Sequence, residues 1–207
     1  MTLMYLIRHG HNQYVEKGKL AGRSPGVHLD ARGQAQAEKL AELLSGAKLK
    51  AVYASPLERT METAAPIAEA AGREVIEVDD LLEMDYGSWQ GRSLKALRRR
   101  KLWSTVQRAP SLARFPGGES FPEAQARIIA GLERLQRKHP QKTAAIACVF
   151  HSDPIKLAIA HYIGLPLDLF QRLVVEPASI NLLVVTSGQA RLLRLNDTRA
   201  TCVDPSG

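Results

Sequence analysis

Five polar side chains, far apart along the chain, are of the types that together transfer a phosphoryl group. Arg8 and Arg59 carry guanidinium groups, whose planar sets of N–H donors match phosphate or carboxylate oxygens. A neutral imidazole among such fixed positive charges keeps a low pKa and stays nucleophilic near neutral pH, so His9 and His151 are candidates for catalysis. Glu83 is a candidate proton donor to a leaving alkoxide. Phosphoryl transfer to histidine requires this combination of nucleophile, electrostatic clamp and acid.

Predicted strands place these side chains near one another. Apolar segments that suit strands buried on both faces end just before Arg8-His9, just before His151 and a few residues before Arg59. Strands alternate with predicted helices, which indicates a three-layer α/β/α fold with a mainly parallel central sheet. Because ligands bind at the carboxyl ends of such strands, we expect the polar residues to meet there. The three strands are expected at 2–7, 50–54 and 143–150.

Helix boundaries follow from capping residues. Asp30 is the expected N-cap of a helix that ends near Gly46. Ser55 is the expected N-cap of a second helix, with Pro56 at its first position and a stop at Gly72. Further elements are expected as a strand at 75–78, helices at 119–139 and 154–163, and a hairpin of strands 182–186 and 191–195 around Ser187-Gly188.

Composition limits the class of protein. The chain has 207 residues, 45% hydrophobic and 24% charged, which predicts a single globular domain over residues 1–207. The longest stretch without a formal charge has 14 residues, fewer than the ~20 that span a bilayer, so no membrane partner is expected. The apolar start runs into Arg8 without a basic leader, which argues against a signal peptide. Cys148 and Cys202 are too few for a disulfide framework, so a reduced, cytoplasmic protein is expected.

The net charge of +7 is concentrated in one segment. Seven basic residues lie within 92–108, and the rest of the chain carries 21 basic and 21 acidic residues. No acidic residue occurs between Asp85 and Glu119. The four consecutive charges at 98–101 would wrap most of a helix at 100° per residue, which favours a solvated helical face. A phosphate-backbone stripe would be one-sided, so no nucleic-acid partner is expected.

Five short motifs are spread along the chain. They are LIRHG at 6–10, SPLERTMETA at 55–64, LEMDYGSWQG at 82–91, FPGGES at 115–120 and HSDPIK at 151–156. These motifs resemble those of the histidine phosphatase superfamily, which contains the phosphoglycerate mutase-like enzymes, and the fourth is similar to that of its phosphatase branch. They occur in the family's order, and the resemblance covers roughly residues 3–185.

The resemblance implies a phosphomonoesterase that hydrolyses a small anionic phosphate ester through phosphorylated His9. It implies that Arg8, Arg59 and His151 hold the phosphoryl oxygens, and that Glu83 donates a proton and later activates water. No metal or other cofactor is expected, because the arginines supply the positive charge. The segment at about 87–118 would cap the site, and its arginines would attract a substrate with more than one acidic group. Family members are often homodimers, so a homodimer is one expected assembly.

Departures from the family pattern lie at the expected rim of the site. Asn12 takes the place of a usual Thr, Ser152 that of a usual Gly, and Gly22 belongs to an Ala-Gly pair in place of Gln-Gly. We expect these three residues to contact the substrate, and their departures leave its identity open. His11 stands where Glu or Gln is common, and we interpret it as a locally hydrogen-bonded rim residue in preference to a third catalytic histidine.

Several alternatives stay open. A phosphomutase uses the same core, and a non-catalytic phosphate- or RNA-binding module would keep the pocket without turnover. Asp85 competes with Glu83 for the role of acid. Glu119 and Ser120 are interpreted as helix-capping residues, and the indoles of Trp89 and Trp103 as packing groups.

Overall fold

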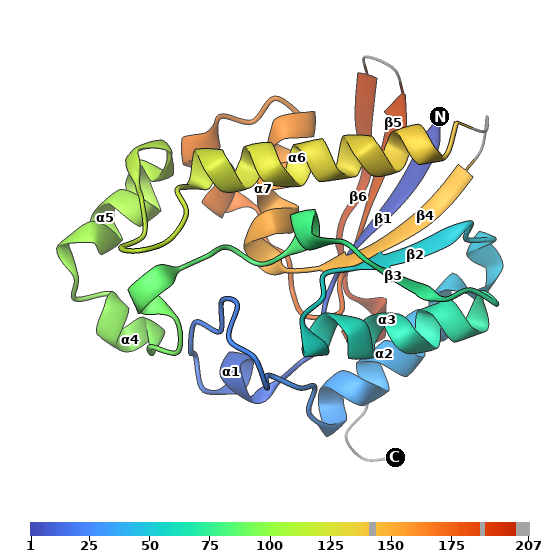
Figure 1. The fold of residues 1–207 in the computed structure, drawn as a ribbon, viewed down its shortest axis with the longest axis horizontal. Helices are drawn as coiled ribbons and strands as arrows, with labels where there is room; N and C mark the ends of the chain where they lie inside the picture. Colours follow the sequence, from blue (N-terminus) through green and yellow to red (C-terminus); the bar gives the residue numbers. More distant parts are fainter. Residues whose placement is uncertain (141–143, 187–188, 202–207) are drawn as a thin grey trace.

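The computed structural model describes residues 1–140, 144–186 and 189–201. A six-stranded sheet runs through the molecule in the order β3-β2-β4-β1-β5-β6 (Figure 1). The first four strands in this order pair in parallel, and β5 and β6 pair antiparallel to their neighbours, so the expected mainly parallel sheet is confirmed. The strands are β1 (Thr2–Arg8), β2 (Ala51–Ala54), β3 (Val75–Glu77), β4 (Ala144–Phe150), β5 (Ile180–Thr186) and β6 (Gln189–Asp197). The predicted hairpin turn Ser187-Gly188 lies outside the described residues, as do Thr143 and Cys202.

Helices cover both faces of the sheet and give the three layers that the sequence predicts (Figure 1). Side chains of α2 (Ala31–Leu44) and α3 (Glu58–Ala70) pack with Ile7, and those of α6 (Phe121–Lys138) and α7 (Ser152–Tyr162) pack with Leu6 on the other face. Successive residues of a strand point to opposite faces, so β1 contributes to both core clusters. All seven residues of β4 are buried, as a central parallel strand requires.

Capping predictions had mixed outcomes. The Asp30 side chain accepts a hydrogen bond from the Gly33 N–H and caps α2, as expected. The prediction for Ser55 was wrong: α3 begins at Glu58, after Leu57, and the Ser55 hydroxyl instead contacts His151. The helix expected at 154–163 begins two residues earlier, at Ser152, directly after β4 and one linking residue. This early start brings the first turn of α7 to the end of the central strand.

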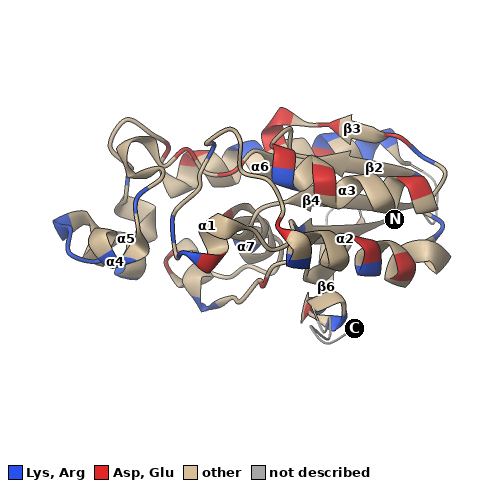
Figure 2. Ribbon diagram, turned by 90° about the horizontal axis from the view of Figure 1, so that it is seen from below, with Lys and Arg blue, Asp and Glu red and all other residues tan. Residues whose placement is uncertain are grey.

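The basic segment forms two short helices beyond the carboxyl ends of β1, β2 and β4. These are α4 (Leu94–Leu97) and α5 (Lys101–Arg108), and Arg98, Arg99 and Arg100 link them. The charged run is exposed, as a solvated face requires, but the helical part of that prediction is wrong, because Arg98–Arg100 form the turn between two helices. Figure 2 shows Lys and Arg on both helices and no Asp or Glu. Among the described residues, no helix is both long and apolar enough to cross a membrane.

Candidate active site

His9 follows β1 and is 5% exposed. Its Nδ1 lies 2.8 Å from the carbonyl oxygen of Gly10, which can only accept, so Nδ1 carries the proton and Nε2 keeps its lone pair. Gly10 packs closely against the first turn of α2, where a Cβ at this position would lie 2.7 Å from the Gly33 oxygen. Burial, with the charges of Arg59 and Arg8, lowers the pKa of His9 well below its ordinary value. His9 therefore stays neutral and nucleophilic across the physiological range.

Arg59, in the first turn of α3, is 1% exposed. Its Nη2 donates to the Gly22 carbonyl at 2.8 Å and contacts Nδ1 of His151 at 3.2 Å. Arg8 donates from Nη1 to the Val175 carbonyl at 2.7 Å. Three buried donors on the two guanidiniums, Nε of Arg8 and Nε and Nη1 of Arg59, have no hydrogen-bond partner within the described chain. Buried unpaired donors are costly, and an anion bound between the two side chains would satisfy them.

His151 is fully buried where β4 ends, with its ring centroid 5.4 Å from that of His9. Because an arginine can only donate, His151 Nδ1 accepts from Arg59, and Nε2 carries the proton that reaches the Ser55 hydroxyl at 2.9 Å. Burial and the charge of Arg59 lower the pKa of His151 well below its ordinary value. A bound anion would reverse this effect by favouring the imidazolium form.

Glu83 is 8% exposed and lines a cavity together with Arg8, His9 and Arg59. Its Oε1 accepts from the Met84 N–H at 2.9 Å, and its Oε2 lies 3.9 Å from His151 Nδ1. Burial, followed by the negative charge of Asp153, raises the pKa of Glu83 to about 7. Asp85 accepts from the Gly87 N–H at 2.9 Å and does not line the cavity. Of the two competing carboxyl groups, the structure brings only Glu83 to the histidines.

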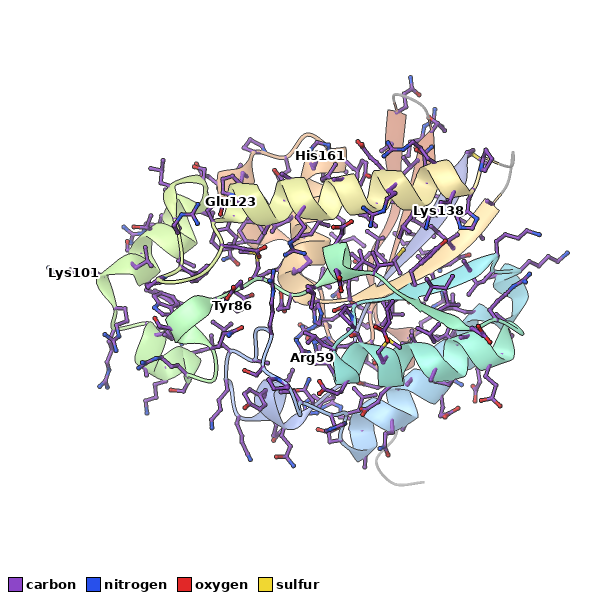
Figure 3. All side chains as sticks on the ribbon, in the orientation of Figure 1. Arg59, Tyr86, Lys101, Glu123, Lys138 and His161 are labelled. Atoms are coloured by element: carbon purple, nitrogen blue, oxygen red, sulfur yellow. The ribbon has the colours of Figure 1, made fainter. Side chains whose placement is uncertain are left out.

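Asp153 was not singled out from the sequence. Its Oδ2 accepts from the Tyr86 hydroxyl at 2.8 Å, and its Oδ1 pairs with Lys156 Nζ at 2.7 Å. Burial alone would raise the pKa of Asp153, but these partners bring it below its ordinary value. Asp153 thus stays charged beside Glu83, and its negative charge favours the protonated form of Glu83. Figure 3 shows Tyr86 in the segment before α4 and Arg59 at the start of α3.

The segment that carries Glu83 is held in place by an ion-pair network that was not predicted from the sequence. Arg127, on α6, donates to the carbonyls of Asp80 and Leu82 at 2.8 and 3.0 Å. It also pairs with Glu119 at 2.9 Å, and Glu119 pairs in turn with Arg23 at 2.9 Å. The expected capping role is confirmed for Ser120, whose side chain accepts from the Glu123 N–H. It was wrong for Glu119, which joins this network.

The three expected rim residues all line the cavity. Asn12 caps α1 (Gln13–Glu16), because its Oδ1 accepts from the N–H groups of the first turn. The carbonyl of Gly22 accepts from Arg59, and the Ser152 hydroxyl donates to the Val175 carbonyl at 3.3 Å. His11 points elsewhere: its Nδ1 lies 2.6 Å from Asp30 Oδ2, and it does not line the cavity. This contact fits the locally bonded interpretation of His11.

The cavity has a volume of about 420 Å³, within the ~300–1,000 Å³ typical of sites for small organic ligands. Its inner end lies at the carboxyl ends of β1 and β4, where Arg8, His9, Arg59 and Glu83 line it. Its outer end lies between the loop after α1 and the helices α4 and α5. The site combines a free imidazole nitrogen, unpaired guanidinium donors and a carboxyl group that titrates near neutrality.

Comparison with known proteins gives a consistent assignment. A model of the histidine phosphatase superfamily (branch 1) matches residues 4–198. Phosphoserine phosphatase 1 of Hydrogenobacter thermophilus is 30% identical over 203 residues, which cover 96% of this chain and 93% of the relative. The probable phosphoglycerate mutase GpmB of an Enterobacter species is 31% identical over 183 residues, covering 87% and 84%. The structure of YhfR from Bacillus stearothermophilus, 22% identical, has the same fold with a TM-score of 0.89 over 97% of this chain and 100% of the other. With its family motifs gathered at one end of the sheet, the chain belongs to the histidine phosphatase superfamily.

Proposed function

We propose that the protein is a phosphomonoesterase that hydrolyses small anionic phosphate esters through a phosphohistidine formed at His9. One observation supports the proposal most strongly: the free Nε2 of His9 shares a cavity with two arginines that have buried donors without a partner among the described residues. The relative named as a phosphoserine phosphatase favours hydrolysis of a carboxylated small ester.

In the first step, the substrate phosphate binds between Arg8 and Arg59, and its negative charge favours protonation of His151. His9 Nε2 donates its lone pair to phosphorus as the bond between phosphorus and the ester oxygen breaks. The departing oxygen takes the proton of Glu83, so an alcohol leaves. A pKa of about 7 keeps roughly half of the Glu83 carboxyl groups protonated at pH 7.

In the second step, water replaces the alcohol beside the phosphohistidine. The Glu83 carboxylate accepts a proton from this water as its oxygen attacks phosphorus, and the phosphorus–nitrogen bond breaks. Inorganic phosphate leaves, and both His9 and Glu83 return to their starting states. The guanidiniums of Arg8 and Arg59 stabilise the charge on the phosphoryl oxygens throughout, so we propose that no metal is required.

The experiment that tests this mechanism is acid-quenched labelling with a ³²P-phosphate ester. The wild-type protein should give an acid-labile, base-stable phosphohistidine within the first turnover, and His9→Ala should give none. His11→Ala is the matched control, because His11 is nearby in sequence but does not line the cavity. Labelling that persists in His9→Ala, or full turnover by that variant, would contradict the proposal.

A phosphomutase is the second candidate, favoured by the similarity to a probable phosphoglycerate mutase. It would return the phosphoryl group to a bound hydroxyl, whereas a phosphatase passes it to water. A coupled assay with 3-phosphoglycerate, with and without 2,3-bisphosphoglycerate, separates the two, and we expect phosphate release without mutase turnover. We also propose a cytoplasmic enzyme, for which the buried thiol of Cys148 in β4 is the supporting observation.

A further inference from the structure

The outer end of the cavity has two walls that are fastened to one another. One wall is the loop after α1, and the other is the segment that leads into α4. The Leu20 N–H donates to the Arg92 carbonyl at 2.9 Å, and the Gly91 N–H donates back to Leu20 at 2.7 Å. The Leu94 N–H donates to the Gly18 carbonyl at 2.8 Å. These backbone bonds fix the walls relative to each other, so the outer cavity has a defined shape.

Much of the surface between these walls is apolar. The indole of Trp103 lines the cavity and stacks on Trp89, with ring centroids 6.3 Å apart and planes at 19°. Burying apolar ligand surface here would contribute roughly 25 cal/mol for each Å² removed from water. The apolar lining of the outer cavity comprises Val15, Leu20, Leu94, Trp103, Val106 and Phe115.

Two basic side chains beside this apolar region, Lys19 and Arg98, have no acidic partner among the described residues. Arg8 and Arg59 belong to the inner end, which leaves Lys19 and Arg98 among the basic residues that line the cavity. Both are exposed, and neither has an ion pair within the described chain; Lys19 Nζ lies 5.9 Å from the Tyr14 ring. They come from the two bonded segments, Lys19 from the loop, where it pairs with Ser93 in a β-bridge, and Arg98 from the end of α4.

No acidic residue that lines the cavity is free to pair with Lys19 or Arg98. The two acidic residues that line it are Glu83, which the reaction uses, and Asp153, whose oxygens are bonded to Tyr86 and Lys156. The segment between Asp85 and Glu119 has no acid at all. Within the described lining of the cavity, a bound ligand is therefore the available source of a negative charge for Arg98. For the same reason, an ammonium group on a substrate would find no free carboxylate here.

We propose that Arg98, assisted by Lys19, binds a second anionic group of the substrate across the apolar wall. The substrate class is then a phosphate monoester whose alcohol or phenol has an apolar body and ends in a carboxylate or a similar anion. This inference rests on the proposed phosphatase function and adds the identity of the leaving group. The sequence suggested that the arginines of the whole basic segment attract the substrate, whereas the proposal assigns this role within the segment to Arg98. Of the seven basic residues in 92–108, all described, Arg98 alone lines the cavity.

The test compares phenyl phosphate with 4-carboxyphenyl phosphate and 4-(2-carboxyethyl)phenyl phosphate at about 0.15 M salt, where long-range steering is screened. The wild-type protein should have a higher kcat/KM for at least one carboxylated ester than for phenyl phosphate. Arg98→Ala should reduce this preference about tenfold, the size expected for a charge-assisted hydrogen bond. Arg98→Glu should reverse it. Arg99→Ala is the matched control: it removes an adjacent exposed arginine that does not line the cavity, and it should keep the wild-type preference.

A second readout separates this inference from the catalytic proposal. Calorimetric binding of the same intact esters to His9→Ala, and to His9→Ala with Arg98→Ala, measures the preference without turnover. If phenyl phosphate is hydrolysed but the carboxylate gives no preference, or if Arg98→Ala and Arg99→Ala behave alike, the role of Arg98 is overturned and the phosphatase function stands. If no ester is hydrolysed, the phosphatase function fails, and the binding preference alone decides the role of Arg98.

Discussion

The two ends of the cavity hold their positive charges in opposite ways. At the inner end, Arg59 is 1% exposed and its Nη2 is fixed between the Gly22 carbonyl and His151. At the outer end, Arg98 is exposed in the turn between two short helices and has no side-chain partner within the described chain. A buried, preorganised charge stabilises a transition state strongly because it need not reorient during the reaction. An exposed charge contributes less to the binding free energy, because water screens it and its side chain can move. The difference in burial matches the roles proposed above, with Arg59 binding the transferred phosphoryl group and Arg98 selecting the substrate.

The largest effect should come from removing the fixed charge. Arg59→Ala should lower kcat by about 10³-fold, because it deletes two donors to the phosphoryl oxygens and the partner of His151. Steady-state kinetics measure the loss, and circular dichroism checks that the variant folds. Arg99→Ala serves again as an arginine control outside the cavity. A loss of kcat below tenfold in Arg59→Ala would mean that the buried arginine contributes no more to the reaction than an exposed one.

Glu83→Gln should lower kcat/KM for an alkyl phosphate by about 10²-fold, the size typical of general acid catalysis. The proton donor is the neutral form, so wild-type kcat/KM should fall as the pH rises through about 7, where Glu83 loses its proton. Glu83→Gln should lack this limb of the pH profile.

The matched control for Glu83 is Asp85→Asn, because Asp85 is two residues away and does not line the cavity. This variant should keep the limb near pH 7. A profile that loses the limb in Asp85→Asn would instead assign the acid to Asp85.

The raised pKa of Glu83 also predicts a stability effect. Its pKa is about 7 in the folded protein and near 4.5 when unfolded, so the folded state binds the proton more tightly. The resulting stabilisation is full below pH 4.5 and is lost as the pH rises through 7, by on the order of 1–3 kcal/mol. Urea denaturation at pH 5 and pH 8 should show this loss in the wild type and a smaller one in Glu83→Gln. Equal losses in the two proteins would contradict the raised pKa.

The smallest effect should come from the network behind the acid. Arg127→Gln removes the donors that hold the carbonyls of Asp80 and Leu82, so we expect kcat to fall about tenfold with little change in KM. A displaced Glu83 should also shift the pH limb, which a purely structural defect would not do. Arg134→Gln, which removes a more exposed ion pair to Asp80 from the same helix, is the control and should keep the wild-type profile.

Most of the catalytic cluster could be predicted from the sequence, because His9, His151 and Arg59 each follow a recognisable strand. His9 and His151 come directly after strands whose continuous apolar runs identify them, and Arg59 comes five residues after another. Parallel strands bring their carboxyl ends to one edge, so strand order alone gathers these side chains. Glu83 lacks this signal, since no long strand precedes it, and its separation from Asp85 needed the structure.

The supporting contacts could not be predicted, because they join segments with no periodic relation. Arg127 donates to carbonyls more than 40 residues earlier in the chain, and nothing in the sequence of α6 distinguishes it from the exposed arginines Arg134 and Arg137. The Ser55 hydroxyl resembles a helix cap in sequence but serves His151. The turn at Arg98 was missed because a run of four charges is compatible with a helix, whereas the structure breaks the helix at that position.

The short turn that joins α4 to α5 bears on how the substrate specificity of such an enzyme can evolve. Its side chains are exposed, they touch neither histidine, and the backbone bonds that position the neighbouring walls do not depend on which residues occupy the turn. If Arg98 selects the substrate as proposed, substitutions in this turn should change which ester is hydrolysed and leave the residues around His9 in place. A new substrate can thus be acquired by point mutations in a few codons, without an intermediate that has lost activity.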